Sequence, residues 1–113
     1  MANQRTIEAM ELVQRIAEEE CDGLLGVFCQ AYLLAARKAK DYQAGVSRDD
    51  YFPFGLQSYV QMIWTKATRL RSIAAKGGAT EFESATDSAL DIINYSAFLV
   101  ERHNREKRDV PRP

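Results

Sequence analysis

The stretch from Leu90 to Val100 constrains the fold more than any other part of the chain, because a helix built from it is apolar on nearly every side. Its apolar residues are Leu90, Ile92, Ile93, Tyr95, Ala97, Phe98, Leu99 and Val100. A helix that is hydrophobic all round is normally buried. The sequence therefore predicts a central helix that is covered by other helices, either of the same chain or of a second copy.

The rest of the chain also has the three- and four-residue apolar period of amphipathic helices, and no stretch alternates like a strand. The expected helices cover 5–20, 23–40, 56–76 and 80–104, with Thr6 or Asn3 as the first N-cap and a break near Cys21–Gly23. We predict an all-α fold, a compact four-helix array forming a single domain over 1–113, with a frayed, charged tail over about 105–113. Because so small an array buries little surface, we expect dimerisation to complete it.

The connection over 41–55 is long for a compact domain, and aromatic residues are concentrated in it. Within it, Ser47 and Asp50 have the spacing of a capping box, which predicts a short helical turn. Two interpretations of its aromatic side chains stay open: they cover the core, or they flank a ligand and stack on a base. These side chains are Tyr42, Tyr51, Phe52 and Phe54.

Charge and composition exclude several classes of protein. Fifteen basic residues against sixteen acidic ones give a formal net charge of -1, which is unlike the positive field of a nucleic-acid binder. Cys21, Cys29 and the single His103 cannot supply the four ligands of a zinc site. The polar N-terminal segment is unlike a signal peptide, and no uncharged run is long enough to span a bilayer. We expect a cytoplasmic protein with reduced thiols.

The candidate chemistry lies on one sector of the helix over 80–104. At about 100° per residue, Glu83, Asp87, Asp91 and Asn94 share this sector with Phe98 and Glu101. A carboxylate stripe is usually a solvated face, but here it continues into the all-round apolar stretch. A buried carboxylate needs a partner or a metal. We therefore expect Asp91 to lie in a polar cluster with Asp87 and Asn94.

The natural partners of these carboxylates are Lys66 and Arg69 on the helix over 56–76. They flank its expected apolar stripe, which consists of Leu56, Val60, Ile63, Ala67, Leu70 and Ala74, whereas Arg71 points outward near Trp64. Carboxylate oxygens suit Mg²⁺, and the two cations suit phosphate oxygens. The same residues can equally form salt bridges between two helices.

Four short motifs occur in a fixed order along the chain. They are K-x-x-D-Y (Lys38, Asp41, Tyr42), K-x-x-R-L (Lys66, Arg69, Leu70), E-S-x-x-D (Glu83, Ser84, Asp87) and D-x-x-N-Y (Asp91, Asn94, Tyr95). Over about residues 24–100 the chain resembles the first type of nucleotide-modification-associated domain, a small helical family of phages and bacteria. That family is in turn similar to the all-α nucleotide pyrophosphohydrolases of the MazG and dimeric dUTPase type.

The resemblance implies a nucleotide-directed protein that binds, and could hydrolyse, a nucleoside phosphate with Mg²⁺. Under it, Asp87 and Asp91 are the catalytic pair and Glu83, Asp87 and Asp91 the metal ligands. The residues implied for nucleotide or phosphate binding are Lys38, Asp41, Tyr42, Lys66, Arg69, Asn94 and Tyr95. A metal-bound water would attack phosphorus in such an enzyme.

The chain departs from the pyrophosphohydrolase pattern on the helix over 56–76. Where those enzymes carry a second acidic motif, E-E-x-x-E, this helix offers Lys66, Arg69 and Arg71. Ser88 also stands where a glutamate precedes the aspartate. The alternative hypothesis is therefore a helical interaction protein that has the fold without the chemistry, such as a phage-encoded inhibitor of a host defence system that binds a host protein.

Overall fold

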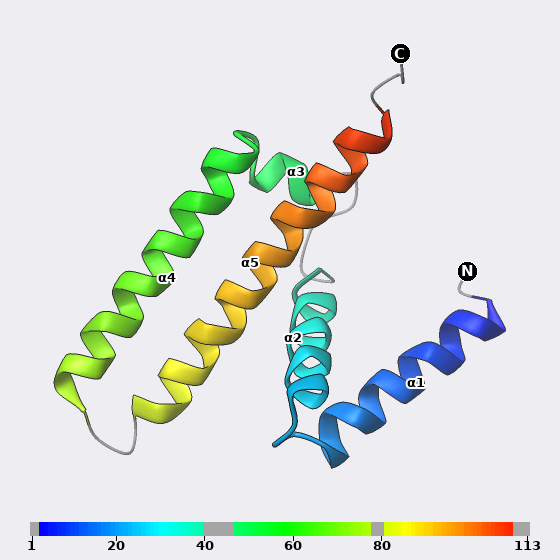
Figure 1. Cartoon of the computed structure of the whole chain (residues 1–113), viewed down its shortest axis with the longest axis horizontal. Coiled ribbons are helices and arrows are strands. Elements are labelled where there is room, and N and C mark those ends of the chain that lie inside the picture. Colours follow the sequence, from blue (N-terminus) through cyan, green and yellow to red (C-terminus); the bar gives the residue numbers. More distant parts are fainter. Residues whose placement is uncertain (1–2, 40–46, 78–80, 110–113) are drawn as a thin grey trace. The chain divides into compact units, whose positions relative to one another are not determined.

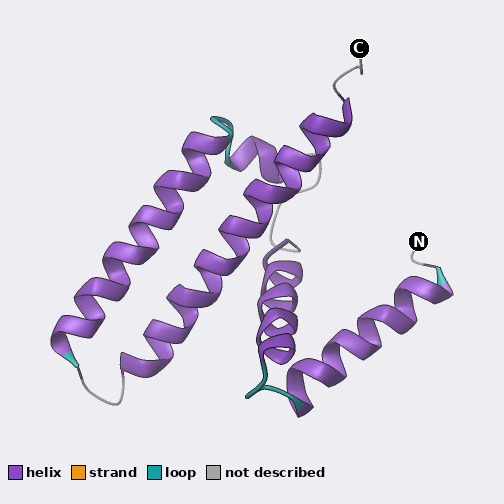
Figure 2. Ribbon diagram, viewed as in Figure 1, coloured by secondary structure: helices purple, strands orange, loops and turns teal. Residues whose placement is uncertain are grey.

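The computed structural model describes residues 3–39, 47–77 and 81–109, except for the side chains of residues 81–83. Within these ranges the chain forms five α-helices and no strand (Figures 1 and 2). The helices are α1 (Gln4–Glu19), α2 (Leu24–Ala39), α3 (Arg48–Tyr51), α4 (Leu56–Lys76) and α5 (Glu81–Asp109). The predicted all-α class is confirmed. The helix beyond the four expected ones is α3, which is the short turn predicted from Ser47 and Asp50.

The helices fall into two compact units, residues 1–43 and residues 44–113. In the first unit α1 packs against α2, and in the second α4 packs against α5. The single domain expected over 1–113 stays a prediction, as does dimerisation. No helix in the described part of the chain combines the length and the apolar character needed to cross a membrane. Cys21 and Cys29 are both free thiols.

In the first unit, the boundaries of α1 and α2 follow from local hydrogen bonds. The side chain of Asn3 accepts a hydrogen bond of 2.9 Å from the amide of Thr6 and so caps α1. The expected break between the two helices is a tight turn, in which the amide of Gly23 donates to the carbonyl of Glu20 at 3.0 Å. The buried residues of this unit are Ala17, Gly26, Cys29 and Ala31, so its core consists of small side chains.

Gly26 allows the end of α1 to approach α2 closely. A Cβ atom at this position would lie 1.7 Å from the carbonyl oxygen of Glu20, far inside van der Waals contact. The obstacle is backbone, so a side chain at residue 26 would have to push the two helices apart. The helical hairpin therefore depends on a glycine here.

We expect Gly26→Ala to destabilise the first unit by about 1–3 kcal/mol, the usual cost of overpacking a fixed backbone contact. Gly23→Ala is the matched control, because its Cβ would meet the same carbonyl oxygen at an ordinary 3.5 Å. Circular dichroism during denaturant unfolding measures both variants. Equal stability of the two variants would contradict the close approach.

In the second unit, α4 and α5 lie side by side and run in opposite directions (Figure 1). Gly55 before α4 and Gly77 after it have φ of 58° and 69°, conformations that favour glycine.

The buried face of α4 is centred on Tyr59, which is 1% exposed. The predicted stripe is wrong in part, because Ile63 and Leu70 are half-buried whereas its other members are exposed: Leu56, Val60, Ala67 and Ala74. Hydrophobicity alone placed them inward, whereas the large ring of Tyr59 fills the contact with α5.

α3 begins with the predicted capping box. The side chain of Ser47 accepts from the amide of Asp50, and the carboxylate of Asp50 accepts from the amide of Ser47 at 2.7 Å. An Asp49 carboxylate then pairs with Arg105 of α5 at 3.4 Å. This contact joins α3 to the part of α5 that was predicted to be a frayed tail.

The frayed tail predicted over 105–113 is corrected in part, since α5 continues to Asp109. Two ion pairs explain the extension. Arg105 reaches Asp49 in α3, and Arg102 pairs with Glu106 one turn further along α5 at 3.1 Å. A charged stretch without apolar residues looks like a solvated tail in the sequence, but tertiary partners hold its first turn helical.

Candidate functional site

An ion pair joins α4 and α5 in the middle of the second unit. The ammonium nitrogen of Lys66 lies 3.0 Å from Oδ2 of Asp91, and their side chains are 25% and 10% exposed. The predicted contact between Asp91 and the basic pair of α4 is therefore present through Lys66. Lys66 lies on the packed face of α4, between Ile63 and Leu70, which are both half-buried.

Two polar side chains accompany Asp91 on the buried face of α5. Ser88 is 2% exposed and Asn94 is 8% exposed, and they lie three residues before and three residues after Asp91. Within the described part of the chain, every buried side-chain nitrogen and oxygen has a hydrogen-bond partner. Lys66, Ser88, Asp91 and Asn94 are hereafter called the polar seam. The burial of Ser88 was not predicted, because a single serine in a helix gives no sequence signal of a buried polar contact.

The other predicted site residues of the second unit are less enclosed. Asp87 and Arg69 are exposed, so neither shares the buried environment of Asp91. The predicted cluster of Asp87 with Asp91 and Asn94 stays a prediction. Lys38 is exposed in the first unit. Asp41, Tyr42 and the side chain of Glu83 lie outside the described residues.

The described residues do not form a complete magnesium site. No group of three or more histidine, cysteine or acidic side chains converges within the described ranges. One oxygen of Asp91 already contacts Lys66, and an ammonium beside a carboxylate disfavours a second cation. Mg²⁺ usually keeps one or two carboxylates and fills the rest of its octahedron with water and phosphate oxygens. Asp87 is the described carboxylate that is accessible for that role.

An aromatic cluster continues the α4–α5 contact beyond the polar seam. It consists of Phe52, Tyr59, Tyr95 and Phe98, with ring centroids 5.1 to 6.3 Å apart. These separations are typical of tilted and edge-to-face pairs. Phe52 belongs to the predicted aromatic connection and covers the core. Tyr51 and Phe54 of the same connection are exposed, so the packing interpretation is confirmed for Phe52 and stays open for the other two.

Arginine side chains close the end of the aromatic cluster. The guanidinium carbon of Arg48 lies 3.8 Å from the ring centre of Phe98, and Arg48 also pairs with Glu101. Arg102 donates to the backbone carbonyl of Phe52 at 3.3 Å and lies 3.8 Å from Asp49. The sequence did not predict these arginine contacts. The sequence feature that could have indicated them is the charge of the predicted short helix, because Arg48 and Asp49 find their ionic partners on α5.

Burial raises the pKa of Tyr59 above its usual value near 10. Removal from water is the largest cause, because the phenolate form loses its solvation in the core. The positive charges of Arg48 and Arg102 act in the opposite direction but are weaker. Tyr59 therefore stays protonated and uncharged at neutral pH.

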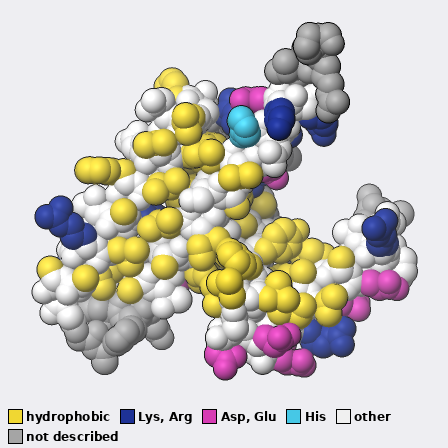
Figure 3. All heavy atoms as spheres, viewed as in Figure 1, with side chains coloured by type: hydrophobic (Ala, Val, Ile, Leu, Met, Phe, Trp, Pro, Cys, Tyr) yellow, Lys and Arg dark blue, Asp and Glu magenta, His cyan; other side chains and the backbone are white. Residues whose placement is uncertain are grey.

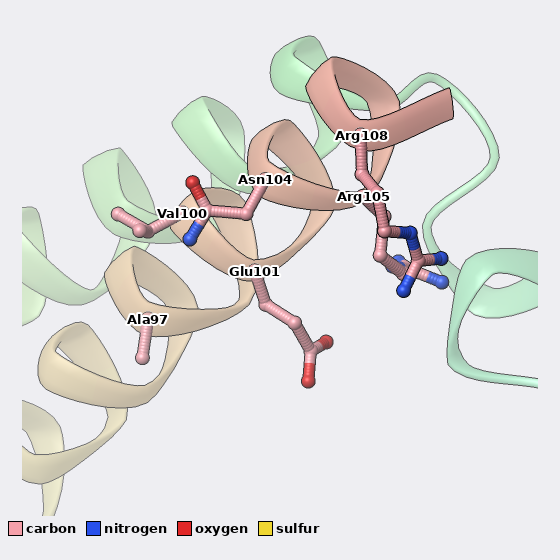
Figure 4. Close-up of a pocket in the computed structure, with 6 residues that line it drawn as sticks. All are labelled: Ala97, Val100, Glu101, Asn104, Arg105 and Arg108. Atoms are coloured by element: carbon pink, nitrogen blue, oxygen red, sulfur yellow. The ribbon is translucent and has the colours of Figure 1, made fainter. Parts of the chain in front are cut away.

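Two cavities of the second unit are poor nucleotide sites. One, of about 180 Å³, lies between Tyr59, Leu99 and Arg102, and it is smaller than the ~300–1,000 Å³ of ordinary ligand pockets. The other is a depression on the C-terminal half of α5 (Figure 4). Its lining residues all belong to α5: Ala97, Val100, Glu101, Asn104, Arg105 and Arg108. Glu101 and Arg105 there already have partners on α3.

These features define a class of protein: a small all-α chain whose longest helices pack around a polar seam and an aromatic cluster. The chain belongs to the family described as nucleotide modification associated domain 1, whose model matches residues 38–100. The match covers more than half of the chain, including the polar seam and the whole aromatic cluster. It starts later than the resemblance expected from residue 24.

No curated protein and no solved structure matches this chain. The family description fits a nucleotide-related protein, in agreement with the predicted resemblance. The more distant similarity to MazG-type pyrophosphohydrolases stays a prediction.

We expect Tyr59 to ionise only above its usual pKa near 10. Because its folded pKa is raised, its stabilising contribution is complete below pH about 10 and is lost as pH rises through the raised pKa. The difference in tyrosinate absorbance between the wild type and Tyr59→Phe during an alkaline titration isolates this one group. A difference curve centred at or below pH about 10 would contradict the burial of Tyr59.

We expect Asp91→Asn to lower the free energy of unfolding by about 1–3 kcal/mol, because it leaves the Lys66 ammonium partly buried without its anionic partner. The partial exposure of Lys66 keeps the loss below that of a fully enclosed pair. Asp87→Asn is the matched control on the exposed turn before it and should change stability by less than about 0.5 kcal/mol. Chemical denaturation distinguishes them, and equal stabilities would show that the ion pair does not hold α4 and α5 together.

Proposed function

We propose that this chain binds a nucleoside phosphate, with the Lys66 side of the polar seam directed at the phosphate groups. The observation that supports the proposal is the buried ion pair between Lys66 and Asp91, inside the segment that matches a nucleotide-related family. An ammonium has three donors, and Asp91 occupies one direction while a quarter of the Lys66 side chain stays exposed. Asp91 would thus orient Lys66 without using all of its hydrogen bonds.

Arg69 extends the cationic surface in this proposal. It lies three residues after Lys66, so the two side chains leave α4 about 5–6 Å apart at their Cβ atoms. Its guanidinium is exposed and can form a bidentate contact with phosphate oxygens. Asn94 and Tyr95 of α5 complete the proposed nucleotide-binding set within this unit. The nucleotide-binding roles expected of Lys38, Asp41 and Tyr42 stay predictions.

Mg²⁺ would enter this site with the phosphates rather than bind beforehand. Asp87 is exposed and Asp91 is engaged with Lys66, so the proposed ligands Glu83, Asp87 and Asp91 would need the phosphate oxygens to complete an octahedral shell. Binding is therefore better supported than hydrolysis, for which Asp87 and Asp91 remain the proposed catalytic pair. We propose that the protein acts in phage or bacterial nucleotide metabolism in the cytoplasm.

Titration calorimetry with nucleoside mono-, di- and triphosphates, with and without Mg²⁺, tests the proposal. We expect Arg69→Ala to weaken binding about tenfold or more, the loss typical of one charge-assisted hydrogen bond. Arg71→Ala is the matched control, since it removes an exposed arginine two residues away on α4. Wild-type protein that binds no nucleotide under any metal condition would refute the proposal, as would equal losses in the two variants.

A second candidate function is a helical interaction protein without nucleotide chemistry, for example a phage-encoded inhibitor of a host defence system. The specific observation in its favour is the exposure of large aromatic side chains. Trp64 is 74% exposed and Phe54 is 78% exposed, and aromatic residues of this kind are enriched in protein–protein interfaces. Under this hypothesis the Lys66–Asp91 pair is purely structural, and the same calorimetry shows no nucleotide binding.

A further inference from the structure

The exposed face of α2 carries an apolar surface that the fold of its own unit does not use. Leu24, Leu25, Phe28 and Tyr32 are 73%, 59%, 51% and 51% exposed. At about 100° per residue they fall within roughly 100° of arc, so they form one continuous stripe. No charged residue interrupts the sequence between Asp22 and Arg37. This stripe is called the α2 face below.

Large apolar surfaces without charges are unusual on a helix that faces only water. The first unit cannot cover the α2 face from inside, because its buried residues are small: Ala17, Gly26, Cys29 and Ala31. A two-helix unit with such a core has little apolar burial of its own, and segments of this size commonly need a partner for stability. Tyr32 also lines a hollow on α1, whose other lining residues are partly polar: Asn3, Arg5, Thr6, Ala9, Met10 and Val13.

The charges at the two ends of α2 indicate which partner fits. Acidic residues gather at the turn before it, namely Glu18, Glu19, Glu20 and Asp22, whereas its last turn is basic, with Arg37 and Lys38. Figure 3 shows hydrophobic side chains along α2 and acidic side chains gathered at the turn between α1 and α2. A second α2 lying antiparallel would place its basic end near this acidic turn, and the helix dipoles would also be opposed.

We propose that the α2 face is the interface of a homodimer in which the two α2 helices pack antiparallel about a twofold axis near Phe28. In this arrangement Phe28 meets its own copy, and Leu24 of one chain lies opposite Tyr32 of the other. The stripe is self-complementary in the way that a twofold interface requires. The inference is independent of nucleotide binding. The sequence predicted dimerisation but did not indicate which surface forms the interface, and the α2 face is the surface proposed here.

The exposed face of α4 is the competing surface, and it is less suitable. Leu56, Val60 and Trp64 are exposed there with a four-residue spacing. However, Gln57 and Arg71 fall in the same arc of the helix, so the apolar stripe is short and bordered by polar groups. Trp64 therefore provides a matched control of similar size and exposure.

Sedimentation of the full chain over a range of concentrations tests the proposal. We expect a wild-type dimer and, for Phe28→Glu, a dissociation constant at least about 100-fold higher, because a charge enters the interface twice. Trp64→Glu should leave the dimer intact, and circular dichroism should show unchanged helix content in both variants. A wild type that remains monomeric at about 100 µM would overturn the proposal, as would dissociation by Trp64→Glu but not by Phe28→Glu.

Cysteine pairing tests the antiparallel direction. In a Cys21→Ser background, which removes the exposed native thiol, Leu24→Cys and Tyr32→Cys chains are mixed and oxidised. The antiparallel dimer brings these two positions together, so we expect disulfides between the two different chains and few between identical ones. A parallel dimer would instead join each variant to itself, and that result would overturn the proposed arrangement.

Discussion

The contact between Lys66 and Asp91 sets the conditions under which α4 and α5 can pack. Both groups are charged, and the loss of water around them costs free energy that only their mutual attraction and further hydrogen bonds offset. Ser88 and Asn94 lie beside the pair with their polar atoms satisfied. The two helices are thereby fixed in one alignment, because a shift by one turn would separate the ammonium from the carboxylate.

Beyond the polar seam, the same alignment of α4 and α5 brings the rings of the aromatic cluster into contact. Tyr59 of α4 contacts Phe52 and Phe98, and its burial is nearly complete. Arg48 and Arg102 then cover the rings and connect them to acidic partners. Gly55 is part of this arrangement, because a Cβ there would meet the Arg102 guanidinium at 3.4 Å and its φ of 58° already favours glycine.

Function in this chain depends on how much of the polar seam is structural. If Lys66 has hydrogen-bonding capacity beyond Asp91, the seam serves both as a support between helices and as one edge of a phosphate site. The family match covers the polar seam, and the exposed aromatic side chains of Phe54 and Trp64 favour an interaction role. The α2 face belongs to the other unit of the chain.

The sequence by itself determined the helical class, the boundaries of α4, the break between α1 and α2, the capping box of α3 and the pairing of Asp91 with a cation. These follow from local hydrogen bonding, periodicity and the cost of burying a charge. Only the tertiary structure decided that Tyr59 and not Leu56 or Val60 fills the core, that Ser88 is buried while Asp87 is exposed, and that α5 extends to Asp109. Periodicity gives the period of a helix but not the direction its neighbour comes from, and that direction decides which apolar face is covered.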